Sequence, residues 1–294
     1  MPEMPEIQAH AERMTIALVG ARLKNFQLLN FAGLKTFSPA ADEAKGATVV
    51  NVTRRAKYLL INFDNDQSHA IHLMQGGRLR PDQKQSKKPR NGIARWVFED
   101  LPDGDGPSTG VEAWLLTEAG TERKAGIWAV AGEPVGQDPL SGLGPEADQI
   151  DRDQLADLLR QHSRRLHGLL RTQSVLAGLG RLLTNEVLYE AALSPFVNAA
   201  KLTDTEIDRL HAAIEIVVGA AIEHERSLDD IGKSADRPSK VHNRSGEPCL
   251  GVKGKKCDDT VHTVEYRKYT VVYCPTRQTG GKKLADNTTS KFLK

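Results

Sequence analysis

Apolar residues near the start of the chain recur at the three- and four-residue spacing of a helix. Between Pro5 and Val19 they fall on one face, and Gly20 follows directly. Such a stripe predicts an amphipathic helix, and glycine is a common residue just past a helix end. We therefore expect a helix over 5–19 whose buried face is formed by Ile7, Ala11, Met14 and Leu18.

The chain then passes into short runs rich in branched and aromatic side chains. Asn65 and Asp66 separate two of these runs, and an alternation of Asp and Gly over 103–107 separates another pair. Both are turn-forming sequences, so the pattern predicts an antiparallel β domain behind one leading helix. The expected strands are Thr48–Val52, Lys57–Phe63, His69–Met74, Ile93–Glu99, Val111–Thr117 and Ile127–Val130.

A basic segment from Arg78 to Asn91 lies between two of these expected strands. It carries six lysines and arginines against a single acidic residue, Asp82. A run so rich in charge is typical of a solvated segment. We expect an exposed, mobile basic loop here.

The second half of the chain has a helical pattern from Ile150 onward. Thr203 and Glu206 form a capping box, which predicts a helix that ends near Glu223. The stretch from Gly132 to Glu146 is rich in Gly and Pro and reads as a linker. The expected parts are a β domain over 1–132, a linker over 133–149, a helical domain over 150–228 and a C-terminal segment over 229–294.

Charge is distributed unevenly, although the total over 294 residues is only +2. Residues 231–294 hold 14 lysines and arginines against six acidic residues, a net charge of +8, so the preceding part carries −6. A basic tail on an acidic body is typical of a protein that meets a polyanion, the alternative being a solubilising tail. No apolar run is long enough for a membrane span, and we expect a cytoplasmic protein.

The three cysteines, Cys249, Cys257 and Cys274, all lie near the C-terminus. An odd number argues against a disulfide framework, and their clustering suggests a metal site or its remnant. A zinc hairpin normally uses two close pairs of ligands. Here the second pair is broken, because Arg277 stands where the fourth cysteine belongs.

The first residues offer a different kind of chemistry. If Met1 is removed, Pro2 becomes a terminal secondary amine with a pKa of about 8. Such an amine can attack a carbon at the aldehyde oxidation level and form a Schiff base, and the neighbouring carboxylate of Glu3 can handle protons. The alternative is that these residues are only a stiff, acidic lead-in to the helix.

A glycine-containing turn over 177–180 separates two helical stretches. Glycine lets the backbone approach a ligand closely, and the start of the following helix presents N–H groups to an anion. The turn with Gly178 and Gly180 is therefore a helix–two-turn–helix arrangement that suits a DNA phosphate.

Four segments together resemble the formamidopyrimidine-DNA glycosylase/endonuclease VIII family. They are the Pro2-Glu3 start, the strand around Lys57, the turn from Gln173 to Gly180 and the final cysteine segment around Cys274, in the family's order. The resemblance implies an α+β multidomain fold. Its parts are an N-terminal antiparallel β-sandwich with a leading helix, a helix–two-turn–helix domain and a C-terminal zinc-finger-like β-hairpin.

The resemblance also implies roles for particular residues. Pro2 matches the proline that attacks C1′ of a flipped, damaged nucleotide, and Glu3 matches the glutamate that assists departure of the base. Glu6 matches a supporting acidic position, and Lys57 matches a lysine that contacts phosphate. The implied activity is a bifunctional DNA glycosylase and AP lyase that excises oxidised bases through a proline Schiff base and nicks the strand.

Recognition positions depart from the family pattern. Gln75 occupies the position of a wedge methionine, and Met74 stands one residue early. Arg123 keeps the arginine that fills the gap left by the flipped base, whereas Ala125 replaces an aromatic wedge. Apolar wedges offset the cost of unstacking, so these changes affect base flipping or lesion choice. In the two-turn motif Arg181 stands where the family has an asparagine that holds phosphates near the lesion, and a guanidinium still binds phosphate but reaches farther. In the hairpin the phosphate-binding arginine falls on Tyr269, with Arg267 and Lys268 as neighbours that would substitute.

The implied partner is damaged double-stranded DNA. We expect a monomeric protein that does not bind membranes and that lies in the cytoplasm, associated with the bacterial nucleoid. Zn²⁺ is the implied cofactor, on the three cysteines with His262 as a fourth ligand; the alternative is a zincless hairpin held by packing. Because the departures fall at recognition positions, two other functions stay open. One is a catalytically weak paralogue that binds nucleic acid, and the other is a general nucleic-acid-binding module.

Overall fold

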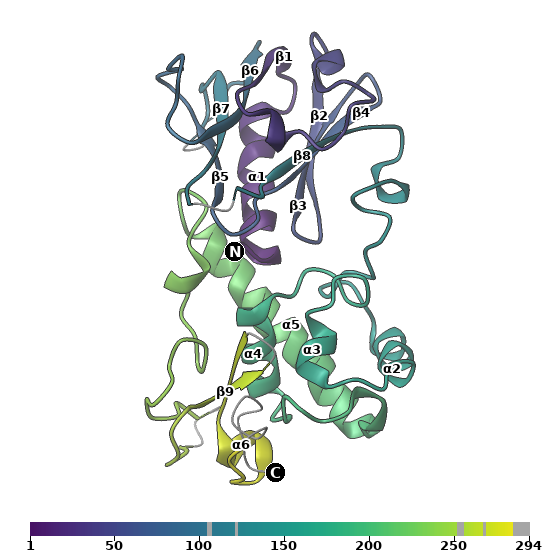
Figure 1. Ribbon diagram of the computed structural model, residues 1–294, viewed down its shortest axis with the longest axis vertical. Helices are drawn as coiled ribbons and strands as arrows, with labels where there is room; N and C mark the ends of the chain where they lie inside the picture. The colour runs from purple at the N-terminus through teal and green to yellow at the C-terminus, as the bar shows by residue number, and fades with distance from the viewer. Residues whose placement is uncertain (105–107, 121–122, 252–255, 267–268, 285–294) are drawn as a thin grey trace. The chain divides into compact units, whose positions relative to one another are not determined.

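The computed structural model describes residues 1–104, 108–120, 123–251, 256–266 and 269–284. It forms two compact units, one of residues 1–142 with 222–234 and one of residues 143–221 with 235–294. Figure 1 shows the strands β1 to β8 around helix α1 in the first unit. None of the helices among the described residues is long and apolar enough to cross a membrane.

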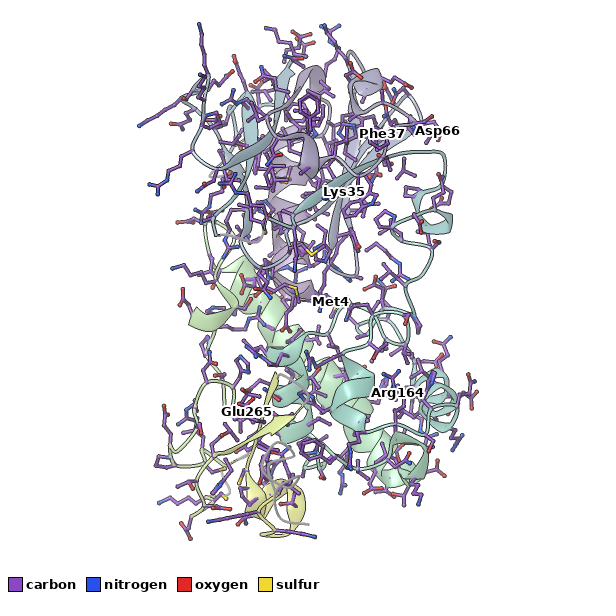
Figure 2. All side chains as sticks on the ribbon, viewed as in Figure 1. Met4, Lys35, Phe37, Asp66, Arg164 and Glu265 are labelled. Atoms are coloured by element: carbon purple, nitrogen blue, oxygen red, sulfur yellow. The ribbon has the colours of Figure 1, made fainter. Side chains whose placement is uncertain are left out.

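Helix α1 (Met4–Leu18) opens the first unit, close to the predicted range. The backbone N–H of Glu3 donates to Oε2 of Glu6 at 2.9 Å, which satisfies a donor that the helix start leaves over. Met4 is fully buried in the first turn (Figure 2). The apolar face predicted from the spacing, with Ile7 and Met14, lies in the core.

Two four-stranded antiparallel sheets pack around this helix. One has the order β1-β6-β7-β5 and the other β2-β3-β4-β8. Core side chains of α1 share one cluster with Trp96 and Trp114 from the first sheet and with Leu59 and Ile61 from the second. The predicted β-sandwich with a leading helix is therefore confirmed. The strands are β1 (Arg22–Leu28), β2 (Val49–Arg55), β3 (Tyr58–Phe63), β4 (Gln67–His72), β5 (Gly77–Pro81), β6 (Gly92–Glu99), β7 (Ala113–Glu118) and β8 (Gly126–Ala131).

The segment predicted as a mobile loop is partly a strand. β5 takes up its first residues and pairs with β7, with Arg78 opposite Thr117. Leu79 is fully buried, whereas Arg78 is half-buried and Arg80 exposed. This is the two-residue alternation of an edge strand, and only one inward apolar residue signals it. The remaining residues, 82–91, form the loop.

The second unit holds the predicted helical part. Its helices are α2 (Arg152–Arg160), α3 (Leu166–Leu170), α4 (Arg181–Glu190) and most of α5 (Asp204–Arg226). At the start of α5, Thr203 N–H donates to Oε2 of Glu206 at 2.9 Å and Glu206 N–H donates to Oγ1 of Thr203 at 3.3 Å. The predicted capping box is therefore confirmed.

A small hairpin and a short helix complete the second unit. β9 (His262–Tyr266) pairs antiparallel with β10 (Tyr269–Tyr273), and α6 (Pro275–Thr279) follows. Tyr189 of α4 shares a buried cluster with the hairpin region, whose other members are Val241, Cys249, Val261, Val272 and Cys274. The helix–two-turn–helix and the hairpin expected from the sequence are both present.

Candidate functional site

The residues that directly follow Met1 are buried at the start of α1. Pro2 is buried, Glu3 is 4% exposed and Glu6 is fully buried. The carbonyl of Met1 accepts a hydrogen bond from the Ser234 hydroxyl at 3.0 Å. The structure thus places Pro2 and two carboxylates together at a helix N-terminus, where negative charge is favoured.

Lys57 lies in the tight connection between β2 and β3. Ala56 just before it has a left-handed φ of 52°, and the Lys57 side chain is only 5% exposed. The first residue of β3, Tyr58, pairs with His72 at the end of β4. Burial, aided by the charge of Lys57, lowers the pKa of His72 to about 4. His72 is therefore neutral at pH 7, and its Nδ1 accepts from Met74 N–H at 3.0 Å.

A tight turn after β4 presents Gln75. Met74 has a left-handed φ of 49° and is half-buried, whereas Gln75 is exposed at the tip. Two glycines close the turn: a Cβ at Gly77 would lie 2.3 Å from the Leu73 carbonyl oxygen, and one at Gly76 would lie 2.6 Å from that of Ala119. Only glycine fits both positions, so the turn holds Gln75 outward against the loop that follows β7.

The loop between β7 and β8 carries Arg123 and Ala125. Arg123 is exposed, and its Nη2 donates to Oδ1 of Asn91 at 3.1 Å. Ala125 is 2% exposed within the core, and its N–H donates to Oε2 of Glu118 at 2.8 Å. Ala125, which the resemblance aligns with an aromatic wedge, is therefore buried and offers no side chain to a ligand.

These residues share one edge of the first unit. Asn91 accepts from the Glu118 backbone N–H at 3.0 Å, which ties the end of β7 to the basic loop. Arg78 donates to the Gly77 carbonyl at 2.7 Å, and the Glu6 carboxylate acts on Arg78 electrostatically. The start of α1, the Gln75 turn and the Arg123 loop are thus linked through β5 and β7.

In the second unit, a side chain shapes the turn between α3 and α4. Gln173 Oε1 accepts from Gly178 N–H at 3.0 Å, and its Nε2 donates to the Leu179 carbonyl at 2.8 Å. Gly178 has a φ of +99°, which favours glycine. Gly180 caps α4, and Arg181 is exposed as the first helical residue. The predicted phosphate-binding residues therefore stand at a helix N-terminus.

Buried polar side chains behind this turn were not predicted from the sequence. Asn185 contacts His167 Nε2 through Oδ1 at 3.1 Å and His242 Nδ1 through Nδ2 at 2.9 Å. Burial lowers the pKa of His167 to about 3 and that of His242 to about 4, so both rings are neutral at pH 7. His167 and His242 lie far apart in sequence, and no local pattern predicts that both contact Asn185.

Glu186 in the next position of α4 anchors the chain before the hairpin. Its carboxylate accepts the backbone N–H groups of Lys240 at 2.7 Å, Val241 at 3.0 Å and His242 at 2.8 Å. Charge-assisted bonds of this kind are among the stronger ones in proteins. The connection of 239–242 to α4 is therefore rigid.

The three cysteines form one cluster. Their Sγ atoms all lie within 4.8 Å of one another, and those of Cys257 and Cys274 are 3.7 Å apart. Two thiolates on one zinc ion lie about 3.8 Å apart, since each Zn–S bond is about 2.3 Å. Burial raises the pKa of the Cys274 thiol to about 12, so loss of its proton needs a nearby cation. The three thiols fit as ligands of a single metal ion.

The structure does not bring His262 into this cluster. Its Nε2 lies 3.2 Å from the Thr260 hydroxyl, and its ring packs near Tyr273. The Tyr189 hydroxyl contacts the cluster, 3.0 Å from Cys249 Sγ. Arg267 and Lys268 lie outside the described residues.

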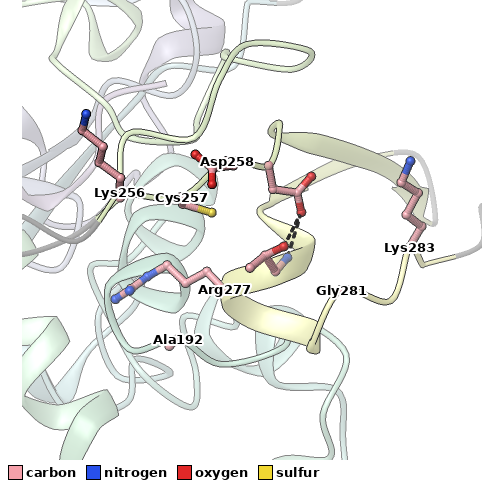
Figure 3. A pocket seen from close by; sticks show the side chains of 10 residues that line it. Ala192, Lys256, Cys257, Asp258, Arg277, Gly281 and Lys283 are labelled. Carbon is pink, nitrogen blue, oxygen red and sulfur yellow. Dashed lines mark hydrogen bonds between the residues drawn. The ribbon is translucent and has the colours of Figure 1, made fainter.

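A cavity of about 690 Å³ opens beside Cys257 (Figure 3). Lys256, Arg277 and Lys283 line it together with two aspartates. Asp259 is engaged there, since its Oδ2 accepts both the N–H and the hydroxyl of Thr276 at 2.9 Å. The partly exposed thiol of Cys257 therefore lies beside a cavity with charged side chains in its lining, which the sequence did not predict.

Comparison with known proteins gives two matching family models. The N-terminal domain of formamidopyrimidine-DNA glycosylase matches residues 1–106, and the H2TH domain of that enzyme matches residues 137–231. An uncharacterized formamidopyrimidine-DNA glycosylase-like protein of Mycobacterium tuberculosis is 36% identical over 154 residues, which cover 52% of this chain and 94% of that protein. The formamidopyrimidine-DNA glycosylase of Chloroflexus aurantiacus is 28% identical over 289 residues, which cover 95% and 98%.

Solved structures agree in fold. The Lactococcus lactis formamidopyrimidine-DNA glycosylase, bound non-covalently to DNA with an AP site, has a TM-score of 0.78 at 20% identity and covers 95% of this chain and 100% of its own. A MutM complex with DNA containing carbocyclic 8-oxo-G has a TM-score of 0.79 at the same identity and coverage. The two family models and the mycobacterial relative show that the chain belongs to the formamidopyrimidine-DNA glycosylase/endonuclease VIII family.

Proposed function

We propose that this protein is a DNA repair glycosylase with AP lyase activity, acting on damaged double-stranded DNA. The observation that carries the proposal is the burial of Pro2, Glu3 and Glu6 together at the start of α1. If this segment only preceded the helix, its two carboxylates would be expected on the surface, because burying a charge is costly. A reactive terminus, by contrast, benefits from a site with restricted water.

The chemical step uses the amine that Pro2 carries once Met1 is removed. Its nitrogen attacks C1′ of the damaged nucleotide, the bond from C1′ to the base breaks, and the base leaves with a proton. The bond between C1′ and O4′ then breaks as Glu3, one residue away, gives a proton to O4′, and the lone pair of the proline nitrogen forms the C1′=N bond of the Schiff base. The resulting Schiff base permits loss of the 3′ phosphate by β-elimination, after which a second elimination removes the 5′ phosphate.

The remaining candidates hold the DNA. Lys57 offers a buried positive charge to a phosphate beside the lesion, and Gln75 and Arg123 stand at the edge linked to it. In the second unit, Gly178, Gly180 and Arg181 offer backbone and guanidinium donors to the phosphate chain. Flipping the damaged nucleotide is required because its C1′ cannot be reached inside the duplex.

Trapping with borohydride tests the proposal. Protein whose free N-terminal proline has been verified by mass spectrometry is incubated with duplex DNA containing an abasic site, and borohydride reduces any Schiff base to a stable adduct. We expect an adduct that disappears in Pro2→Gly. Absence of an adduct on abasic, oxidised-purine and oxidised-pyrimidine duplexes would falsify the proposed chemistry.

Pro5→Ala is the matched control. Pro5 also lies in the first turn of α1 and is buried, yet it has no free amine in any processed form of the chain. It should keep the adduct at the wild-type yield. Equal loss of the adduct in Pro5→Ala and Pro2→Gly would point to damage of the helix start and not to a missing nucleophile.

A second candidate function is a paralogue that binds nucleic acid with weak base excision. Ala125 favours it, because that residue is buried in the core and offers no wedge to the DNA. This function predicts binding of damaged duplex with an adduct only at preformed abasic sites. Excision from a duplex with an intact damaged base therefore separates the two candidates.

We further propose that Cys249, Cys257 and Cys274 hold a zinc ion. Zinc would cross-link the hairpin to the chain before it, with no part in the chemical step. Elemental analysis should find about one zinc per chain in the wild type and a loss of zinc in Cys257→Ser. A metal-free wild-type protein that remains folded would contradict this assignment and favour a hairpin held by packing.

A further inference from the structure

The outer face of the sheet β1-β6-β7-β5 carries the basic loop 82–91. Four of its side chains, Lys84, Lys87, Lys88 and Arg90, are exposed. In the part of the chain that the structure describes, none of the four makes an ion pair or a side-chain hydrogen bond. Its only acidic residue, Asp82, pairs instead with Arg95 at 2.7 Å. The loop therefore presents four uncompensated cations.

A buried arginine fastens this loop to the sheet. Arg95 is 3% exposed, and its Nη1 donates to Gln27 Oε1 at 2.9 Å. Its Nη2 reaches the loop and donates to the Ser86 carbonyl at 2.7 Å. A guanidinium whose donors are satisfied in a fixed fork gives a rigid attachment. The backbone of the loop is thus held in place, so its ordering costs little when the exposed cations meet a partner.

The end of the loop returns to the edge that carries the recognition residues. Gly92 donates to the Pro89 carbonyl at 3.2 Å, and a Cβ at Gly92 would lie 2.7 Å from Pro89 Cγ. Asn91 then accepts from Arg123, the candidate that faces the gap beside a flipped base. Lys87, Lys88 and Arg90 are therefore continuous with the proposed DNA edge of the first unit.

We propose that this loop is a second DNA contact, which binds backbone phosphates of the duplex away from the damaged nucleotide. This inference rests on the proposed function and adds a contact outside the chemistry at Pro2. Phosphate neutralisation needs cations without protein partners, and these four meet that condition. Such contacts strengthen binding to damaged and undamaged duplexes alike, and they weaken with salt because bound counterions are released.

The salt dependence of binding tests the loop. We compare wild type with Lys87→Gln/Lys88→Gln/Arg90→Gln on one undamaged and one abasic duplex over a range of salt concentrations. Each phosphate contact contributes about 0.9 to the slope of log affinity against log salt. We expect the slope to become shallower by about 2 to 3 units on both duplexes and the affinity at low salt to fall by at least about tenfold. An unchanged slope overturns the inference.

Arg22→Gln/Lys24→Gln/Lys45→Gln is the matched control. It removes the same charge from the same unit, but Arg22 pairs with Glu99 at the end of β6 opposite to the loop. Its slope should equal that of the wild type. An equal loss of slope in both variants would mean that general charge and not this loop governs binding, which also overturns the inference.

A second variant tests the attachment. Asp82→Leu/Arg95→Met leaves the net charge unchanged but frees the loop from the sheet. We expect a several-fold loss of affinity with a slope close to that of the wild type, since the cations remain and only their ordering changes. Wild-type affinity in this variant, with folding verified by thermal unfolding, would refute the positioning role of Arg95.

The outcome is distinguishable from failure of the proposed function. At saturating DNA the loop variant should give the same borohydride adduct as the wild type, because Pro2 is untouched. A wild type without an adduct but with the expected slopes would overturn the catalytic proposal and leave this DNA contact standing. A normal adduct, with equal salt slopes for the wild type and the loop variant, would support the catalytic proposal and overturn this DNA contact.

Discussion

Arg277 donates from Nε to the backbone carbonyl of Tyr189 at 2.6 Å, and its Nη2 donates to the carbonyl of Glu190 at 2.8 Å. The guanidinium also lies 5.1 Å from the centre of the Tyr189 ring. Both carbonyls belong to the last turn of α4, where backbone carbonyls have no donor within the helix and positive charge is favoured. The residue that replaces an expected cysteine therefore caps a helix.

Arg277→Met should lower the free energy of unfolding by about 2 kcal/mol, because two charge-assisted hydrogen bonds and a favourable dipole contact are lost together. Arg277→Lys keeps the charge but not the planar fork, so its loss should be smaller. Urea unfolding measures both. A Met variant as stable as the wild type would show that water replaces the guanidinium at these carbonyls without cost.

Glu186→Gln should be more disruptive than the same change at Glu190 on this helix. The carboxylate of Glu186 accepts three backbone N–H groups, whereas an amide presents one acceptor and an unsuitable donor. We expect a loss of about 2 to 4 kcal/mol of unfolding free energy. Glu190→Gln is the control: it loses the charge of one ion pair, with Lys240, but keeps an amide oxygen that can accept from that lysine, so its loss of unfolding free energy should be smaller. Equal losses would contradict the anchoring role of Glu186.

Local patterns predicted most of the elements in the fold. The helix at 5–19, six strands and the capping box at Thr203 follow from spacing within a few residues. β1 (Arg22–Leu28) was not predicted, because Lys24, Asn25 and Gln27 interrupt its apolar positions. β5 was hidden for a similar reason, since Arg78 and Arg80 dominate a strand in which Leu79 alone is apolar and buried. Strands whose outward face is charged carry little signal in a single sequence.

Candidate residues with a chemical signature were found from the sequence, and supporting residues were not. Pro2, Lys57 and the cysteines stand out by type and position. Arg95, Asn185 and Glu186 act through partners that are brought close only by folding. Their charge or polarity suggests a solvated face, and burial reverses that interpretation. Predicting them requires knowledge of which distant segments meet.

Stability should fall as the pH drops below 7, because five histidines are buried as neutral rings. Burial lowers the pKa of His10, His69, His72 and His242 to about 4 and that of His167 to about 3. In the unfolded chain the histidines have a pKa of about 6.5. Between these values the unfolded state binds more protons, so each histidine removes up to about 1.4 kcal/mol of unfolding free energy per pH unit. The loss begins near pH 6.5 and continues to about pH 4.

His10→Leu tests this dependence at one site. His10 is buried and packs edge-on against Trp114, so an apolar residue of similar size is tolerated there. The variant should match or exceed the wild type at pH 5 and show a shallower decline of unfolding free energy between pH 6.5 and 4. Urea unfolding at four pH values measures both slopes. Parallel slopes in the two proteins would mean that His10 accepts a proton without unfolding.

Removal of Lys57 should raise the pKa of His72. The charge of Lys57 adds to burial in disfavouring the imidazolium, and burial is the larger cause. In Lys57→Met we therefore expect a His72 pKa above about 4 but still below its ordinary value of about 6.5. NMR of the imidazole protons reports it directly, and Lys24→Met, on β1 of the other sheet, should leave it unchanged. A phosphate bound at Lys57 compensates the same charge, so an abasic duplex should move the His72 pKa upward in the wild type and not in Lys57→Met. A duplex that binds without this shift would show that its phosphates do not contact Lys57.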